Sequence, residues 1–325
     1  MSELTIVVPA FNEAAVLDAF HQRLARVLDA LPLDSAVLYV DDGSTDGTWA
    51  LIERLLASDG RARALKLSRN FGKEAALTAG LDHVTEGAAV AIDADLQDPP
   101  ELIPELVAQW RAGFDVVYAT RSARAGETRL KRFTAAGFYR AMERFSDTPL
   151  PRDTGDFRLL SRRALDALAR LRERQRFMKG LFAWIGYRQT AVRYQREPRQ
   201  AGRSKWNYWR LTQLAIEGIT SFSTAPLRLA TWVGLGSSML AFVYGVWVLA
   251  KALVWGDPVR GYPTLMLVIL FLGGVQLLAL GVIGEYLGRS YAESKQRPLY
   301  FVEEERLGDH GIGHRPLDTM PTPRR

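Results

Sequence analysis

The chain has 325 residues, of which 48% are hydrophobic and 24% are charged, and its formal net charge is +6. This length suits one large domain or two ordinary domains, and the absence of cysteine excludes a disulfide framework and thiolate metal sites. A net positive charge would suit a nucleic acid, but the cations crowd beside two apolar segments, so we expect no nucleic-acid partner.

The amino terminus lacks the basic stretch and the apolar core of a signal peptide, so the first part of the chain is expected to stay in the cytosol. Leu4 to Val8 is a β-branched run and is predicted to be a strand. The loop from Pro9 to Glu13 follows it, and apolar residues then recur at helical spacing from Val16 to Leu31. The chain is therefore predicted to begin with a strand, a loop and a helix.

Two similar units are predicted to follow. A buried strand at Val37 to Val40 ends in Asp41 and Asp42, and the glycine, serine and threonine residues after them favour a tight turn and a helix cap. The next strand is predicted at Ala64 to Leu67, with a loop from Ser68 to Lys73 and then another helix.

The fourth predicted strand leads into the sequence Asp93-Ala94-Asp95-Leu96-Gln97. Two carboxylates spaced Asp-x-Asp after a buried strand leave the sheet edge together, and such hard oxygen ligands suit Mg2+ or Mn2+ rather than zinc. A solvated turn is the alternative for an isolated match. A fifth strand is predicted at Val116 to Tyr118.

The alternation of short apolar strands with helices predicts an α/β fold, in which helices cover both faces of a mostly parallel sheet. In such sheets a ligand binds beyond the carboxyl ends of the strands. The charged and amide side chains of the first four units all follow strands, so they are expected to gather at that edge. This clustering favours a ligand site over a set of unrelated turns.

Basic residues are frequent between Arg121 and Arg144, and several guanidinium groups near a metal site would suit a second phosphate. A solvated helix face explains the same residues equally well. Asp153 to Ser161 is predicted to be a polar, glycine-containing loop, in which Asp156 is either a turn residue or a catalytic acid. A second basic loop spans Arg196 to Lys205.

Leu229 to Ala250 and Leu265 to Ile283 are runs of 22 and 19 residues without a charged side chain. Each is long enough to cross a bilayer, which takes about 20 apolar residues. Because arginine and lysine are more numerous on the outer flanks than in the connecting loop, both flanks are expected in the cytoplasm. Asn207 to Phe222 is predicted to be a helix in the membrane interface, or alternatively a core-packed amphipathic helix. The tail from Glu303 is expected to be disordered.

These features together resemble the polyprenyl-phosphate glycosyltransferases of glycosyltransferase family 2, which include bacterial bactoprenol glucosyltransferases and dolichyl-phosphate mannosyltransferases. The resemblance covers the chain to about Val302 and rests on the two apolar runs and four motifs, Pro9-Ala-Phe-Asn-Glu13, Asp41-Asp-Gly-Ser-Thr-Asp-Gly47, Arg69-Asn-Phe-Gly-Lys73 and Asp93-Ala-Asp-Leu-Gln-Asp-Pro-Pro-Glu101. Processive synthases of the family carry a Gln-x-x-Arg-Trp signature and more spans. This chain has neither, so a single transfer is expected.

The resemblance implies a GT-A fold, a nucleotide-sugar donor and a divalent cation, Mg2+ or Mn2+. It implies a nucleotide site made of Pro9, Ala10, Phe11, Asn12, Glu13, Asp41, Asp42, Arg69, Lys73, Asp93 and Ala94. It further implies metal ligands Asp93, Asp95 and Gln97, and catalytic residues Asp95 and Asp156. The acceptor phosphate is expected on Arg121, Arg129 and Arg132, and a mobile active-site loop is expected to contain Arg199, Arg203 and Lys205.

The implied reaction is the inverting transfer of one sugar, most simply glucose from UDP-glucose, to undecaprenyl phosphate. The alternatives are a GDP-mannose donor with a dolichyl-type acceptor, a UDP-aminoarabinose-type donor and, in another class, a catalytically silent membrane scaffold that binds nucleotide. A separate flippase and self-association into a homo-oligomer are further expectations.

The resemblance and the apolar runs together predict four regions. These are a cytosolic GT-A domain at residues 1–205, an interfacial region at 206–228, two transmembrane helices within 229–286 (about 229–252 and 263–286) and a cytosolic tail at 287–325. The expected location is the cytoplasmic (inner) membrane, crossed more than once, with the catalytic domain and both termini in the cytoplasm.

Overall fold

The computed structural model describes residues 3–121, 154–174, 176–194, 225–255 and 261–307. The chain divides into two compact units, which are described separately below. Within the described residues, the first unit contains the chain up to residue 194 together with residues 298–307, and the second contains residues 225–255 and 261–297.

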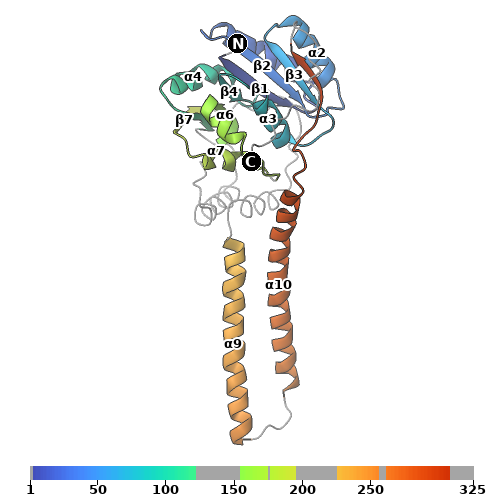
Figure 1. Cartoon of the computed structure of the whole chain (residues 1–325), viewed down its shortest axis with the longest axis vertical. Coiled ribbons are helices and arrows are strands. Elements are labelled where there is room, and N and C mark those ends of the chain that lie inside the picture. The colour runs from blue at the N-terminus through green and yellow to red at the C-terminus, as the bar shows by residue number, and fades with distance from the viewer. Residues whose placement is uncertain (1–2, 122–153, 175, 195–224, 256–260, 308–325) are drawn as a thin grey trace. The chain divides into compact units, whose positions relative to one another are not determined.

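The first unit is built on one sheet, whose described strands lie in the order β7-β5-β6-β4-β1-β2-β3-β8 (Figure 1). The strands are β1 (Leu4–Ala10), β2 (Ser35–Asp41), β3 (Ala62–Leu67), β4 (Ala88–Ala91), β5 (Val116–Arg121), β6 (Thr154–Leu160), β7 (Gln189–Tyr194) and β8 (Val302–Leu307). The pairings among β1 to β4 and between β5 and β7 are parallel. β6 is antiparallel to β4 and β5, and β8 is antiparallel to β3. The prediction of a mostly parallel sheet is confirmed.

Helices cover both faces of this sheet (Figure 1). They are α1 (Leu17–Asp29), α2 (Thr48–Ser58), α3 (Lys73–Asp82), α4 (Ile103–Arg111) with the preceding 3-10 turn η1 (Pro100–Leu102), α6 (Arg162–Leu168) and α7 (Met178–Trp184). The side chains of α1, α2 and α4 share one hydrophobic cluster with alternate residues of β1, such as Ile6 and Val8. α3 packs on the opposite face, against Val7. Because both faces are covered, the central strands are buried along their length.

α3 approaches the sheet so closely at Gly80 that only glycine fits there. A Cβ atom added to Gly80 would lie 2.3 Å from Val7 Cγ1 and 3.0 Å from Val40 Cγ2. Both neighbours are stiff β-branched side chains on central strands, so they have little freedom to move away. The small residue at position 80 therefore allows the close packing of α3 on the sheet.

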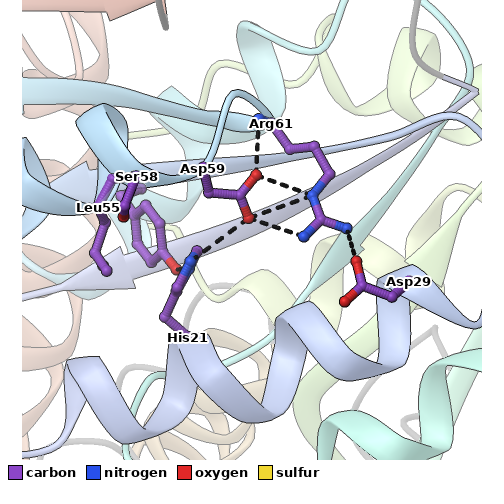
Figure 2. A network of polar contacts seen from close by, with 7 residues as sticks. His21, Asp29, Leu55, Ser58, Asp59 and Arg61 are labelled. Atoms are coloured by element: carbon purple, nitrogen blue, oxygen red, sulfur yellow. Dashed lines mark hydrogen bonds and ion pairs between the residues drawn. The ribbon is translucent and has the colours of Figure 1, made fainter.

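A polar network ties α1 to β2 and to the turn between α2 and β3 (Figure 2). In Figure 2 Asp59 lies between His21 and Arg61; its carboxylate is 3.5 Å from His21 Nε2 and accepts hydrogen bonds from the Arg61 guanidinium. Arg61 also forms an ion pair with Asp29 at 2.8 Å, and His21 Nδ1 lies 2.8 Å from the hydroxyl of Tyr39. Burial, opposed by the nearby Asp59, lowers the pKa of His21. The network therefore holds a histidine that favours its neutral form.

The second unit consists, within the described residues, of two long helices, α9 (Ala225–Trp255) and α10 (Tyr262–Ser294), which contact one another. They expose many large apolar side chains, including Trp232, Phe242 and Leu277. One stretch of α10, Phe271–Ser294, is long and apolar enough to cross a membrane, and Ala230–Tyr244 of α9 is a shorter apolar stretch. Of the two transmembrane helices predicted, the described residues thus support one by length and composition.

Two sequence predictions are corrected by the fold. Residues 153–161 were expected to be a loop, but Thr154–Leu160 is strand β6. The tail was expected to be disordered from Glu303, but Val302–Leu307 is strand β8, which is ordered by backbone pairing with β3 rather than by apolar side chains of its own. Residues 206–224 of the predicted interfacial region lie outside the described part of the chain, and residues 225–228 form the beginning of α9.

Candidate active site

The loops after β1 and β2 are joined by hydrogen bonds into one structure. The backbone N–H of Asn12 donates to Ser44 Oγ at 3.0 Å, and the N–H of Thr45 donates to Asn12 Oδ1 at 2.9 Å. The N–H of Glu13 donates to the hydroxyl of Thr48 at 2.9 Å. Asn12 has φ of 57°, a left-handed conformation that asparagine tolerates better than most residues. The predicted nucleotide loops therefore meet at the carboxyl edge of the sheet.

Asp41 and Asp42 are both buried and act on the backbone of neighbouring loops. Asp41 accepts from the N–H of Ser44, whereas Asp42 accepts from the N–H groups of Phe71 at 2.7 Å and Gly72 at 2.9 Å. Burial raises the pKa of both carboxyl groups, and the N–H donors oppose this. Asp42 thus holds the third loop in place.

The third loop, Ser68 to Lys73, lies against the turn after β2. Gly43 has φ of +68°, and a Cβ atom there would lie 2.6 Å from the backbone carbon of Arg69. The guanidinium of Arg69 stacks on the ring of Phe71 at 4.1 Å from the centroid. The ring of Phe71 also lies 6.3 Å from that of Phe301, a residue just before β8.

The predicted metal loop after β4 is anchored by buried residues. Leu96 adopts φ of 58° and is only 1% exposed, and Asp98 is 3% exposed. The hydroxyl of Tyr194, on β7, donates a hydrogen bond to Asp98 Oδ1. The N–H of Gln97 donates to Asp95 Oδ1 at 3.1 Å. The loop is thus fixed at two points, while the Asp93 and Asp95 side chains remain partly exposed.

Lys73, at the start of α3, joins the metal loop to β6. Its Nζ lies 2.6 Å from Asp93 Oδ2 and 2.5 Å from Asp156 Oδ2. These two carboxylates raise the pKa of Lys73, outweighing the opposite effect of burial. Burial alone would raise the pKa of Asp156, but the ammonium groups of Lys73 and Lys179 outweigh it and lower that pKa to about 2. Asp156 is therefore ionised at any physiological pH.

Three further charged residues surround Asp156, and sequence reasoning did not single them out. Together we call Lys73, Glu74, Asp156, Arg158 and Lys179 the Asp156 cluster. Arg158 is buried, stacks on the ring of Phe182 at 3.9 Å, and donates to the carbonyl of Gly155 at 2.7 Å. Burial, followed by the charge of Asp156, raises the pKa of Glu74 to about 7. The spacing of Asp156 and Arg158 by two residues was the available signal, because it places both on one face of a strand.

The cluster leaves carboxylate oxygens available. Among the described residues, Glu74 Oε2 and Asp156 Oδ1 are buried and accept no hydrogen bond. No group of three or more His, Asp or Glu side chains in the described part of the chain is arranged to hold a metal ion. A site with two aspartates and an amide is compatible with this finding, because Mg2+ is usually bound by one or two carboxylates together with substrate phosphates.

Most of the expected site residues thus come together at one edge of the first unit. Asn12, Asp41, Lys73, Asp93 and Asp156 come from five segments of the chain that meet there. Arg121 is the last residue of β5. Arg129 and Arg132, expected at the acceptor phosphate, and Arg199, Arg203 and Lys205 of the expected mobile loop, lie outside the described residues.

Comparisons with known proteins show the family to which the chain belongs. The family model "Glycosyl transferase family 2" matches residues 5–169, and "GtrB C-terminal hairpin" matches residues 225–290. An uncharacterized glycosyltransferase of Synechocystis is 51% identical over 98% of this chain and 99% of its own length. The bactoprenol glucosyl transferase of Shigella phage SfV is 47% identical over 94% of this chain and 99% of its own length. Among solved structures, glucosyl-3-phosphoglycerate synthase of Mycobacterium tuberculosis has a TM-score of 0.44 and 23% identity, covering 67% of this chain and 76% of that chain.

Proposed function

The chain belongs to glycosyl transferase family 2, and on this premise we propose that it transfers one sugar from a nucleotide sugar to undecaprenyl phosphate at the cytoplasmic face of the membrane. The observation that carries the proposal is the bridge of Lys73 between Asp93 and Asp156, which joins the predicted donor loop to the predicted acceptor side. Relatives named bactoprenol glucosyl transferase support the acceptor class, and glucose from UDP-glucose is the first donor to test.

The donor side of the site fits a divalent cation. Asp93 and Asp95 both present carboxylates beyond the end of β4, and Gln97 follows in the same loop. These three residues would hold Mg2+ or Mn2+, with the donor diphosphate completing the coordination. When bound, such an ion would act as a Lewis acid that stabilises the negative charge developing on the departing diphosphate. The N–H groups and side chains of the loops after β1, β2 and β3 would orient the nucleotide.

The acceptor scarcely needs a base. A phosphate monoester has a second pKa of about 6, so it is mostly a dianion at neutral pH. Its oxygen would attack the anomeric carbon on the side opposite the leaving group, the bond from that carbon to the diphosphate would break, and the nucleoside diphosphate would leave with the bonding electrons. Inversion follows from this single displacement. Asp156, with its low pKa, would hold Lys73 in place rather than accept a proton.

Membrane attachment is supported by the connectivity of the chain. The sheet of the first unit contains strands from before α9 and also β8 from after α10. A pair of membrane-crossing helices whose two ends both return to one folded unit must begin and end on the same side. We therefore propose two transmembrane helices within α9 and α10, with the first unit in the cytoplasm.

A donor panel tests the proposed reaction. The full chain in detergent and lipid would receive undecaprenyl phosphate with UDP-glucose, GDP-mannose or a UDP-aminoarabinose-type donor, with Mg2+ or Mn2+. We expect a lipid-linked sugar by mass spectrometry and release of an equal amount of nucleoside diphosphate from one donor, both abolished by EDTA. Asp93→Ala and Asp95→Ala should remove the metal-dependent part of donor binding. Full activity in EDTA would refute the metal site, and no turnover with any donor would favour the scaffold alternative.

A further inference from the structure

Resting on the proposed function, we propose that Lys179 binds the phosphate group of the lipid acceptor. Lys179 is the second residue of α7 and belongs to the Asp156 cluster. It lies in a part of the chain that the sequence motifs do not reach.

α7 presents Lys179 to the same face of β6 as Asp156 and Arg158. Phe182, which lies one helical turn after Lys179, packs its ring against the Arg158 guanidinium at 3.9 Å. Residues three apart on a helix lie on the same side, so Lys179 faces the strand next to this contact. The neighbouring Met178 is buried, with its sulfur 3.8 Å from the Thr78 hydroxyl of α3. The beginning of α7 is therefore fixed between α3 and β6.

Two of the three cations in the cluster already have partners within the protein. Lys73 forms ion pairs with both Asp93 and Asp156. Arg158 is 3% exposed, and it is held by the ring of Phe182 and the carbonyl of Gly155. Lys179, by contrast, forms no hydrogen bond or ion pair with another described residue, and it is only half-buried. Lys73 is more exposed than Lys179, but its ammonium group is already paired, so Lys179 is the partly exposed cation of this cluster that has no partner among the described residues.

The charge balance favours an anion beside Lys179. Lys179 is close enough to Asp156 to lower the pKa of that carboxyl group, but it forms no ion pair with it: Asp156 Oδ2 is paired with Lys73, and Asp156 Oδ1 accepts no hydrogen bond from a described residue. Burial lowers the pKa of Lys179; the Asp156 charge opposes this, and the charges of Arg158 and Lys73 add to it, so holding the positive charge there costs free energy. A phosphate dianion beside Lys179 would offset the free-energy cost of keeping its ammonium group charged, because this group binds phosphate as a compact point charge. The donor diphosphate would instead lie on the metal loop.

The test measures KM for each substrate in Lys179→Met and Lys179→Gln, using the full chain and undecaprenyl phosphate in lipid vesicles. We expect KM for undecaprenyl phosphate to rise by about tenfold to a hundredfold, since a charge-assisted hydrogen bond is lost. KM for the nucleotide sugar should stay within about twofold, and Lys179→Arg should restore most of the acceptor affinity. Arg170→Met is the matched control, because it removes one exposed positive charge from the same unit outside the cluster.

Inorganic phosphate provides a second readout. It should compete with the lipid acceptor in the wild type, and its inhibition constant should rise in Lys179→Gln by the same factor as the acceptor KM. An unchanged acceptor KM in both variants would overturn the inference. So would an equal rise in both KM values with a lower melting temperature, because that would indicate a structural role. Turnover by the wild type in the same assay tests the proposed function separately, so a failure of one is distinguished from a failure of the other.

Discussion

The Asp156 carboxylate shows how two ammonium groups decide the chemistry of one side chain. Lys73 Nζ lies 2.5 Å from Asp156 Oδ2, and Lys179 adds a second positive charge nearby. The pKa of about 2 that results is far below the neutral range, where a general base works best. Glu74, whose pKa is raised to about 7, is the group of the cluster that changes protonation near neutral pH. The structure thus favours a positioning role for Asp156.

Asp156→Asn tests this role. The substitution removes one of the two carboxylates that hold Lys73, and we expect kcat to fall on the order of a hundredfold. Because no proton acceptor is lost, raising the pH from 7 to 9 should not restore the rate. The measurement is kcat against pH for wild type and variant, with Asp166→Asn on the exposed side of α6 as control. A steep recovery of the variant at high pH would show that Asp156 is a general base.

At the scale of secondary-structure elements, the network around Asp59 joins a helix, a strand and a turn (Figure 2). His21 comes from α1, Tyr39 from β2, and Asp59 and Arg61 from the turn between α2 and β3. Burial lowers the pKa of His21 below its ordinary value of 6.5. The unfolded chain therefore binds a proton at this residue more readily than the folded chain does.

The stability of the first unit is accordingly expected to depend on pH through His21. A depressed histidine pKa contributes fully above about pH 6.5, and its contribution is lost as the pH falls below that value toward the folded-state pKa. The melting temperature should drop by a few degrees more between pH 7.5 and 5.5 in the wild type than in His21→Gln, which keeps a hydrogen-bonding group beside Tyr39. His83→Gln is the control. Equal drops in all three proteins would contradict the prediction.

At the scale of the whole molecule, the chain returns to the first unit after α10 and contacts the third nucleotide loop. The N–H of Ser68 donates to the carbonyl of Phe301 at 3.0 Å, and the Phe301 ring lies 6.3 Å from that of Phe71. Tyr300 is buried, and its hydroxyl donates to Asp82 at the end of α3 at 2.9 Å. The segment that follows the helical hairpin therefore supports the loop that Asp42 also holds.

Phe301→Ala is expected to loosen this loop and to weaken donor binding. The loss of one aromatic pair is worth about 0.5–1.5 kcal/mol, which corresponds to a rise of about twofold to tenfold in KM for the nucleotide sugar. KM for undecaprenyl phosphate should not change. Glu303→Ala is the matched control, because its exposed ion pair with Lys66 at 3.5 Å should contribute little. A donor KM that does not change in Phe301→Ala would show that the contact has no role in binding.

Much of the fold was predictable because strands and helices leave local patterns. The apolar runs of β1 to β4 and the helical spacing of α1 are set by neighbouring residues, as are the two long apolar helices. β6 was predicted to be a loop because Asp156 and Arg158 make its sequence look polar. Phe157 and Leu159 alternate with them and are fully buried, which is the pattern of a strand with one face turned to a polar site.

The sequence by itself determined the class of the protein: a mostly parallel sheet with acids after its strands, motifs of glycosyl transferase family 2, and apolar runs long enough for a membrane. Only the tertiary structure decided which charges meet. Lys73 contacts carboxylates 20 and 83 residues away in the chain, and β8 reaches the edge of β3 after the helical hairpin. Such contacts depend on strand order and on how α3 and α7 pack, which local periodicity does not encode.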